Sequence, residues 1–401
     1  MRLLLVRENF ICDHAKSMIL SNKASMDSPV ETSTQRKTIG ITGATGLLGW
    51  HLRAFLQTDA NLRVVPAPRS WLTTAEELDA LVSECDVLVH LAGMNRGSDH
   101  EVEATNVALA EALVAACERT ESMPHVIYSN SIHSTQDNAY GRSKRCAAEK
   151  LERWAARAGA VFTDVVLPHV FGECGKPFYN SVVSTFCHQL ANDLKPEIQK
   201  DMELELLHAQ QFARKILEIA SEGKGGQVRV RGVPITVTEL LSKLTLLAKQ
   251  YQGHVVPDLR EEISLDLFNT YRSYLFPVRY PVTVKVHTDQ RGSLFEAVKT
   301  IHGGQCFLSS TRPGVTRGNH YHTRKFERFL VVRGTATIRV RKVFDTALTE
   351  FEVQGDSPRF VDMPTLNTHN ITNTGDSELI TLFWAHEIFD PAHPDTFPES
   401  V

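Results

Sequence analysis

A glycine triplet near the start of the chain constrains the fold more than any other feature. Gly43, Gly46 and Gly49 stand at GxxGxxG spacing in TIGITGATGLLGWHLRAFL, between an apolar run typical of a strand and a segment with helical periodicity. Glycines at this spacing permit a tight turn, a close approach of the backbone to a pyrophosphate, and tight packing of helix on strand. The N-terminus of the helix also offers amide groups to phosphates. The pattern predicts a Rossmann-type α/β domain from residue 38, with these glycines in the cofactor site.

The segment after the second predicted strand bears on the choice of coenzyme. An NAD enzyme places a carboxylate near this point to hold the ribose, whereas NLRVVPAPRSW carries Arg69. An arginine suits the 2′-phosphate of NADP, so NADPH is favoured over NADH, although a plain surface arginine is the alternative. The next apolar run, CDVLVHLAGMNR, is typical of a buried parallel strand and places Leu91, Ala92 and Gly93 beside the coenzyme.

A serine, a tyrosine and a lysine supply the expected catalytic chemistry. Tyr140 and Lys144 are four residues apart, so they lie on one face of a helix near the coenzyme, and Ser131 ends the strand before it. A neighbouring ammonium depresses the pKa of a tyrosine, and with the serine hydroxyl this makes a proton donor for a carbonyl that receives hydride. A YxxxK spacing is common by chance, but behind a glycine-rich strand and helix it indicates a reductase.

Residues 38–275 resemble the extended short-chain dehydrogenase/reductase family, whose members act mostly on nucleotide sugars. The resemblance implies a catalytic role for the serine, tyrosine and lysine described above. Downstream, GKPFYNSVVSTFCHQL looks like a substrate-binding loop and helix, in which Lys176 and Asn180 reach a diphosphate or a uracil. An ordinary helix cap with a solvated lysine is the alternative.

The chain departs from that family in two segments. In VVLPHVFG, Val166 and His169 stand in place of an arginine and an asparagine. In LLHAQQFARK, Gln210 and Gln211 stand where an acidic pair is expected. Members of the family use these segments to contact cofactor or substrate, so the resemblance leaves substrate positioning open at these residues.

Length and composition narrow the remaining classes of protein. A chain of 401 residues is longer than the chains that usually fold around a single hydrophobic core, which suggests two domains. The formal charge of -4 offers no basic excess for a phosphate backbone, so nucleic acid is not an expected partner. The seven cysteines are scattered without a CxxC pair, which indicates neither a disulfide framework nor a cysteine zinc site and fits a reducing cytoplasm.

The first 37 residues are predicted to be a disordered extension. Their opening apolar run is four residues long, which is too short for a signal peptide or a membrane span, and the rest is rich in Ser, Thr, Asp and Lys. We therefore expect no membrane partner and a cytoplasmic location.

Over residues 276–401 the pattern changes to the alternation of an all-β barrel or sandwich, punctuated by turn signals such as DQRG, RPG and NTGD. His320 and His322 are two apart on a predicted strand, so both rings point to one face, and Glu327 follows on the same hairpin. With His369 they offer three nitrogens and one carboxylate, a set that suits zinc or another divalent transition metal.

This second half resembles the cupin family. The segment GNHYHTRKFE with its flanking glycines fills the first cupin motif, and MPTLNTHNITN fits the second, although Leu366 replaces the usual glycine. Upstream, VHTDQRGSLFEAV resembles the opening of cupin-type sugar-nucleotide 3-epimerases. That resemblance implies that Arg291, supported by Asp289 and Glu296, holds a nucleotide diphosphate; a turn followed by a hairpin acid is the alternative.

Together the two halves resemble the bifunctional capsular-polysaccharide enzymes of the CapF family over roughly residues 38–401. The resemblance implies an NADPH-dependent reductase joined to a zinc-bearing cupin on the route to UDP-N-acetyl-L-fucosamine. The cupin would invert C3 of UDP-2-acetamido-2,6-dideoxy-4-hexulose, and the reductase would reduce C4 to the L-talose product. A 4-ketone acidifies the hydrogen on C3, so epimerisation must precede reduction. Because cupins often pair through edge strands, we also expect a homodimer.

Two other hypotheses fit the same sequence. One is an NADPH-sensing binding protein without turnover, although its catalytic serine, tyrosine and lysine are all present. The other is a plain 4-ketoreductase whose cupin is only structural. For the base that removes the C3 proton, His287, Lys325 and His386 are candidates of equal standing.

Overall fold

The computed structural model describes residues 36–401 except 73, 285–286, 290–291, 295–297, 302–303 and 388–390. The predicted N-terminal extension therefore lies outside the described residues, apart from its last two positions. Residues Arg36–Val401 pack as one unit. Among the described residues, no helix combines the length and the apolar character needed to cross a membrane.

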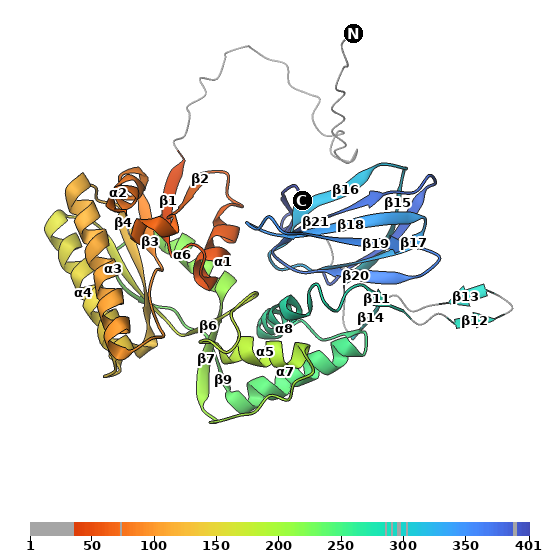
Figure 1. The fold of residues 1–401 in the computed structure, drawn as a ribbon, viewed down its shortest axis with the longest axis horizontal. Helices are drawn as coiled ribbons and strands as arrows, with labels where there is room; N and C mark the ends of the chain where they lie inside the picture. Colours follow the sequence, from red (N-terminus) through yellow and green to blue (C-terminus); the bar gives the residue numbers. More distant parts are fainter. Residues whose placement is uncertain are drawn as a thin grey trace, which may run out of the picture. The chain divides into compact units, whose positions relative to one another are not determined.

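A parallel sheet forms the centre of the N-terminal half, with the strand order β2-β1-β3-β4-β5-β8 (Figure 1). Its strands are β1 (Lys37–Thr42), β2 (Leu62–Pro66), β3 (Val87–His90), β4 (His125–Ser131), β5 (Phe162–Leu167) and β8 (Gly226–Arg229). The helices that cover it are α1 (Leu47–Leu56), α2 (Ala75–Glu84), α3 (Asp99–Thr120), α4 (Ala139–Ala158) and α6 (Ala209–Glu222).

Successive side chains of each strand point to opposite faces of the sheet, and the helices are divided between these two faces. In β3, Val87 and Val89 belong to the buried cluster that includes α1 and α6. Leu88 belongs instead to the cluster that includes α2, α3 and α4. All four residues of β3 are buried, as expected for a strand covered on both faces.

A smaller layer of strands and helices completes this half. Its elements are the sheet β6 (His169–Phe171), β7 (Glu203–His208) and β9 (Val233–Thr236), the helices α5 (Val182–Ala191), α7 (Val237–Gln252) and α8 (Glu262–Leu275), the short strand β10 (Val255–Val256), and the 3-10 turns η2 (Arg69–Leu72) and η3 (Ile132–Thr135). One apolar cluster continues from this layer into the C-terminal half, because Leu267 and Phe268 of α8 share it with Phe329 and Val361.

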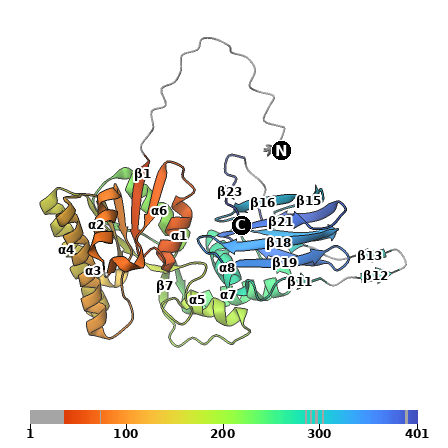
Figure 2. The same cartoon turned by 45° about the horizontal axis from the view of Figure 1, so that its top comes forward.

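Two five-stranded antiparallel sheets form the C-terminal half, with the orders β11-β20-β17-β22-β15 and β19-β18-β21-β16-β23 (Figure 1 and Figure 2). Their strands are β11 (Val282–Thr283), β15 (Gln305–Thr311), β16 (Thr316–Tyr321), β17 (Glu327–Arg333), β18 (Thr335–Lys342), β19 (Leu348–Gln354), β20 (Arg359–Met363), β21 (Asn367–Asn373), β22 (Leu379–Ala385) and β23 (Phe397–Pro398). Separate short strands are β12 (His287–Asp289), β13 (Gly292–Leu294) and β14 (Lys299–Thr300). The predicted fold class, a Rossmann-type domain followed by a cupin barrel, is confirmed.

A buried ion pair in the C-terminal half contacts the helical layer. Arg328 on β17 donates through Nε and Nη2 to the two carboxylate oxygens of Asp362 on β20, at 2.6 and 2.9 Å, and neither side chain is more than 2% exposed. Tyr251 on α7 donates its hydroxyl to the same carboxylate, and Arg272 on α8 donates to Tyr251 at 3.3 Å. Removing one member therefore leaves a charge buried without its partner.

We expect Arg328→Met to lower the free energy of unfolding by about 3–5 kcal/mol, measured by urea unfolding of the full chain. The matched control is Arg339→Met, because Arg339 pairs with Glu350 at 2.5 Å while both side chains are at least 36% exposed. The control should change the free energy by less than about 1 kcal/mol, and equal losses in both variants would contradict the argument.

Candidate functional site

The carboxyl ends of the parallel strands open into a cavity of about 1050 Å³. In an open α/β sheet this is the edge at which ligands bind. The predicted site residues that line the cavity are Gly43, Gly46, Gly49, Arg69, Leu91, Gly93, Ser131, Tyr140, Lys144, Lys176 and Asn180. The structure thus brings together residues predicted separately for coenzyme, catalysis and substrate.

The glycine turn fits its expected role through close backbone contacts. Gly43 has φ 67°, and a Cβ there would lie 2.7 Å from the backbone nitrogen of Ala92. A Cβ on Gly49 would lie 2.6 Å from the Cα of Ala44. Gly46 precedes α1 without any side-chain cap, so the first amides of that helix are available to phosphate oxygens. Ala92 is the one predicted coenzyme residue not among the lining residues; it packs behind Gly43.

The three predicted catalytic residues meet where β4 ends and α4 begins. Asn138 caps α4 by accepting a hydrogen bond from the backbone nitrogen of Gly141 at 2.8 Å, which sets Tyr140 in the first turn and Lys144 one turn later. The Lys144 ammonium donates to the backbone oxygen of Ser129 at 2.5 Å and lies 4.3 Å from the centre of the Tyr128 ring. Ser131 stands at the end of β4 within the same cavity.

The electrostatics of this group differ from the sequence-based expectation. Burial lowers the pKa of Lys144 to about 7, with the carboxylate of Asp164 opposing the shift. Burial raises the pKa of Tyr140, and a hydrogen bond with Ser131 opposes it. The sequence predicted a lowered tyrosine pKa, but here burial outweighs the hydrogen bond and the lysine amine is turned to a backbone carbonyl.

Asn106 on α3 is a lining residue that the sequence analysis missed. It is buried, accepts from the backbone nitrogen of Met94 at 2.7 Å, and donates to the hydroxyl of Ser143 at 2.9 Å. It thereby joins the loop after β3 to helix α4. The available signal was an asparagine on the helix face that otherwise carries the buried apolar residues Val102 and Leu109.

The four residues at which the sequence departs from the reductase family lie in different surroundings. Val166 is buried in β5, and His169 lines the cavity, with its ring centre 5.3 Å from that of His133. Gln210 and Gln211 are not among the lining residues. The Nε2 atom of Gln210 lies 3.0 Å from Nδ1 of His51, and Gln211 donates to Asp266 at 3.0 Å. The glutamines therefore act on a buried polar cluster behind the cavity.

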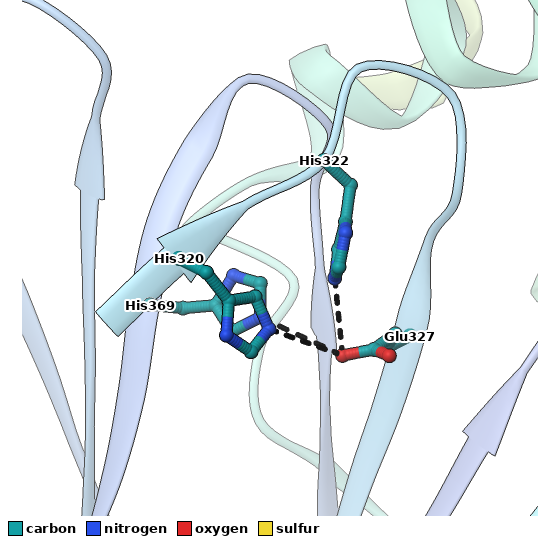
Figure 3. A group of neighbouring side chains, drawn as sticks. All are labelled: His320, His322, Glu327 and His369. Atoms are coloured by element: carbon teal, nitrogen blue, oxygen red, sulfur yellow. Dashed lines mark ion pairs between the residues drawn. The ribbon is translucent and has the colours of Figure 1, made fainter. Parts of the chain in front are cut away.

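The predicted metal ligands form one cluster in the C-terminal half (Figure 3). One ligand atom from each of His320, His322, Glu327 and His369 lies within 4.8 Å of all the others. The Nε2 atoms of the three histidines lie 4.0, 3.3 and 3.6 Å from Oε2 of Glu327. Burial alone would raise the pKa of Glu327, but the three histidines lower it well below its usual value.

Hydrogen bonds orient the rings of two of the predicted metal ligands. Nδ1 of His322 donates to the backbone oxygen of Asp395 at 2.5 Å, and Nδ1 of His369 donates to that of Asn367 at 3.1 Å. This leaves the Nε2 lone pairs aimed into the cluster, where both atoms are buried without a hydrogen-bond partner among the described residues. Burial also lowers the pKa of His369 to about 4, so its ring is neutral. The donor set fits a divalent transition metal.

Unusual backbone conformations place these ligands. A β-bulge interrupts the pairing of β16 with β21 between Gly318 and His320, and the intervening Asn319 has φ 60°. Leu366 has φ 58°, which explains why cupins usually carry glycine at this position. The Leu366 backbone nitrogen donates to the backbone oxygen of His322 at 2.8 Å, so the strained residue supports a ligand directly.

The remaining predicted residues belong to the proposed diphosphate site and to the three candidate bases. Asp289 and His287 lie in β12, whereas Arg291 and Glu296 lie outside the described residues. Nζ of Lys325 lies 3.6 Å from Oε1 of Glu327, so this candidate base contacts the metal cluster. The ring of His386 stacks on Phe326 and accepts a hydrogen bond from its backbone nitrogen at 3.2 Å.

The fold and the two sites define a class of protein, a nucleotide-binding α/β domain joined to a cupin-type domain. Residues 39–230 match the NAD dependent epimerase/dehydratase family, and residues 287–397 match the polysaccharide biosynthesis C-terminal domain. The α/β half also shares its fold with UDP-N-acetylglucosamine 4-epimerase from Methanobrevibacter ruminantium, at 15% identity and a TM-score of 0.52 over 60% of this chain and 99% of that one.

Two relatives match nearly the whole chain. One is UDP-2-acetamido-2,6-beta-L-arabino-hexul-4-ose reductase from Pseudomonas aeruginosa, 33% identical over 90% of this chain and 98% of the relative. The other is the crystal structure of capsular polysaccharide assembling protein CapF from Staphylococcus aureus, 35% identical with a TM-score of 0.58 over 90% of this chain and 100% of that one. The chain belongs to the CapF family.

We expect Lys144→Met to raise the free energy of unfolding by about 1–3 kcal/mol at about pH 6. The reason is that the folded wild-type protein must bury the ammonium of Lys144, whereas the variant buries a neutral side chain. The pKa of Lys144 is about 7 in the folded protein against 10.5 ordinarily, so between these values the unfolded chain binds more protons. Wild-type stability therefore rises over this range, and the gain from the substitution should shrink by about pH 9.5.

Urea unfolding of both proteins at the two pH values, without added coenzyme, measures this difference. The control is Lys150→Met, since Lys150 is a partly exposed residue on the same helix that pairs with Glu111 at 2.8 Å. A gain that stays the same at both pH values would show that lysine burial is not its cause.

Proposed function

We propose that this chain is a bifunctional sugar-nucleotide enzyme that makes a precursor of a surface polysaccharide. In the proposal the cupin half epimerises C3 of UDP-2-acetamido-2,6-dideoxy-4-hexulose. The α/β half then reduces C4 with NADPH to the UDP-2-acetamido-2,6-dideoxy-L-talose product. The observation that carries the proposal is that Ser131, Tyr140 and Lys144 line the same cavity as the glycine turn.

The named relatives support the substrate class. The Pseudomonas relative is named as a reductase of a UDP-linked 4-keto sugar, and the Staphylococcus relative is named for capsular polysaccharide assembly. Both align with nearly the whole chain, including both halves. This supports a sugar nucleotide as substrate and a biosynthetic role.

In the reductase half, the glycine turn and Arg69 would hold NADPH, which supplies the hydride. Tyr140 donates a proton to the C4 oxygen as negative charge develops there. Ser131, hydrogen-bonded to Tyr140, holds that hydroxyl toward the substrate. Once its amine turns from the Ser129 carbonyl toward Tyr140, Lys144 would stabilise, as a cation, the tyrosinate left behind. Lys176 and Asn180 would hold the diphosphate or the uracil.

The surroundings of Lys176 and Asn180 support a role in binding the diphosphate or the uracil. Arg96 donates to Oδ1 of Asn180 at 2.9 Å, and the charged groups of Arg96 and Lys176 each lie 5.1 Å from the centre of the Tyr179 ring. Lys176 and Tyr179 line the cavity, and Arg96 lies against Tyr179 and Asn180, so two cations and an aromatic ring gather where an anionic nucleotide is proposed to bind.

In the cupin half, His320, His322, Glu327 and His369 would hold zinc or another divalent transition metal, which polarises a carbonyl oxygen. The C4 ketone makes the C3 hydrogen acidic, so a base in this half removes it and a proton returns to the opposite face. Lys325 contacts the metal cluster, and His287 and His386 are the other candidates for this base. Asp289 and Arg291 would hold the diphosphate.

A single reaction tests both halves of the proposal. The purified protein is given NADPH and UDP-2-acetamido-2,6-dideoxy-4-hexulose in deuterated water, NADPH loss is followed by absorbance, and the product is read by NMR. We expect NADPH oxidation together with deuterium at C3. Tyr140→Phe should lower kcat for NADPH oxidation by about 10²–10⁴ while leaving C3 exchange unchanged, because it removes the proton donor of the second step alone.

The other outcomes separate the alternative hypotheses. NADPH loss without deuterium at C3 would leave a plain 4-ketoreductase with a structural cupin. Neither signal, with NADPH still bound, would favour the NADPH-sensing protein.

A substitution in the predicted metal cluster should have the opposite effect to Tyr140→Phe, a loss of C3 exchange with reduction retained. We expect His320→Asn to lower zinc affinity and C3 exchange by at least about 100-fold, because it removes one of four donors. Reduction of a 4-keto sugar that already carries the inverted C3 should continue at saturating NADPH. Zinc content by atomic absorption and exchange by NMR measure the two effects, with His100→Asn on α3 as an exposed control. Full C3 exchange in a zinc-free variant would exclude a catalytic metal.

A further inference from the structure

Glu173 is a buried carboxylate that lies between the two candidate sites. It follows β6 in the segment 172–176, named here the pocket loop, and its side chain is 2% exposed. Cys174, Gly175 and Lys176 of the same loop line the coenzyme cavity. A buried carboxylate requires partners, and those of Glu173 come from both halves of the chain.

On the reductase side, two histidines hold Glu173. Nε2 of His208 donates to Oε2 of Glu173 at 3.1 Å, and Nε2 of His51 on α1 donates to its backbone oxygen at 3.2 Å. Burial alone would raise the pKa of Glu173, but His208 and His51 lower it to about 2, so the carboxylate is ionised. The carboxylates of Asp266 and Glu173 in turn raise the pKa of His208 to about 9 against the effect of burial.

The pocket loop has little room to move independently of Glu173. A Cβ on Gly172 would lie 2.9 Å from Nε2 of His51. The hydroxyl of Tyr274 on α8 donates to the backbone oxygen of Gly175 at 2.5 Å, and the hydroxyl of Ser273 accepts from the backbone nitrogen of Cys174 at 3.1 Å. Glu173 and these contacts together set the position of the cavity wall.

On the cupin side, Glu173 contacts the turn that supports the metal ligands. The hydroxyl of Thr365, itself 3% exposed, donates to Oε1 of Glu173 at 2.8 Å. The next residue, Leu366, donates to the backbone oxygen of His322 at 2.8 Å. Asn367 donates to the backbone oxygen of Thr365 at 2.9 Å, and its own backbone oxygen accepts from Nδ1 of His369 at 3.1 Å.

The same turn is strained and is held by packing from the reductase half. Leu366 has φ 58° and is fully buried in a cluster with Trp50 of α1. The indole nitrogen of Trp50 donates to the backbone oxygen of Val343 in the cupin half at 2.9 Å. A leucine persists in this conformation only where its surroundings fix it, and strained residues of this kind are common in switch regions.

We infer that Glu173 is a positioning residue that couples the coenzyme cavity to the metal cluster through Thr365. The inference rests on the proposed function, since it takes NADPH and zinc as the two occupants. A metal held by His322 and His369 fixes the turn between them, and Thr365 in that turn fixes the carboxylate and the pocket loop. NADPH then binds to a wall that is already ordered, so less conformational entropy is lost.

The expected result is positive cooperativity between the two ligands. Zinc should tighten NADPH binding about fivefold, and by thermodynamic linkage NADPH should tighten zinc binding by the same factor. Fluorescence titration with NADPH, on zinc-loaded and chelator-treated full-length protein, measures the first effect. Competition for zinc with a chromogenic chelator, with and without NADPH, measures the second.

Thr365→Val tests the route of the coupling, because it removes the hydroxyl and keeps the shape of the side chain. In this variant the affinity for NADPH with and without zinc should be nearly equal, and so should the affinity for zinc with and without NADPH. Thr365→Ser, which keeps a hydroxyl, should retain both of the roughly fivefold effects. The matched control is Thr368→Val, since Thr368 is equally buried but donates to the backbone oxygen of Glu399 within the cupin half at 2.6 Å. A merely structural role for Thr365 would lower stability without changing either of these effects.

The outcomes separate this inference from the proposed function. Wild-type protein that binds both ligands with independent affinities overturns the inference alone, as does coupling that survives in Thr365→Val. Wild-type protein that binds no NADPH or no zinc overturns the proposed function and, with it, the inference.

Discussion

The close approach of the Gly43 backbone to the loop after β3 is the constraint on which the coenzyme cavity depends. A Cβ at Gly43 would lie 2.7 Å from the backbone nitrogen of Ala92, so any side chain would force these two strand ends apart. Because β1 and β3 are neighbours in the sheet, their separation would also displace the start of α1 and the ends of the strands beyond. Gly43 thus helps to set the backbone geometry at the strand ends where the predicted catalytic residues lie.

Burial acts on the two sites in related ways. In the reductase cavity it lowers the pKa of Lys144 to about 7, and in the cupin cluster it lowers the pKa of His369 to about 4. A neutral imidazole is a metal ligand, whereas an amine near its pKa at neutral pH exchanges protons readily. Desolvation therefore favours the neutral form of both side chains, which suits the metal binding proposed for His369 and the proton transfer proposed for the cavity around Lys144.

The sequence was sufficient to predict the fold class where a binding site needs particular residues at short spacing. The Rossmann and cupin halves were predicted from the glycine triplet and from the histidine and glutamate pattern, and the fold class is confirmed. The domain limits, the role of each site residue and the homodimer stay predictions. Long-range partners carried no comparable signal, because Thr365 and Glu173 are 192 residues apart and neither belongs to a periodic pattern. The direction of the Tyr140 pKa was also wrong, since burial depends on the packed structure.

The order of the proposed reactions gives a reason for joining the sites through a polar contact. Epimerisation must come first, because the C3 hydrogen is acidic only while the C4 ketone remains. A reductase that acts regardless of the cupin would remove that ketone too early. The hydrogen bond between Thr365 and the ionised Glu173 is directional, so it depends on the position of the turn that also supports His322 and His369. Occupation of the proposed metal site can therefore bias how well the pocket loop is ordered before the coenzyme binds.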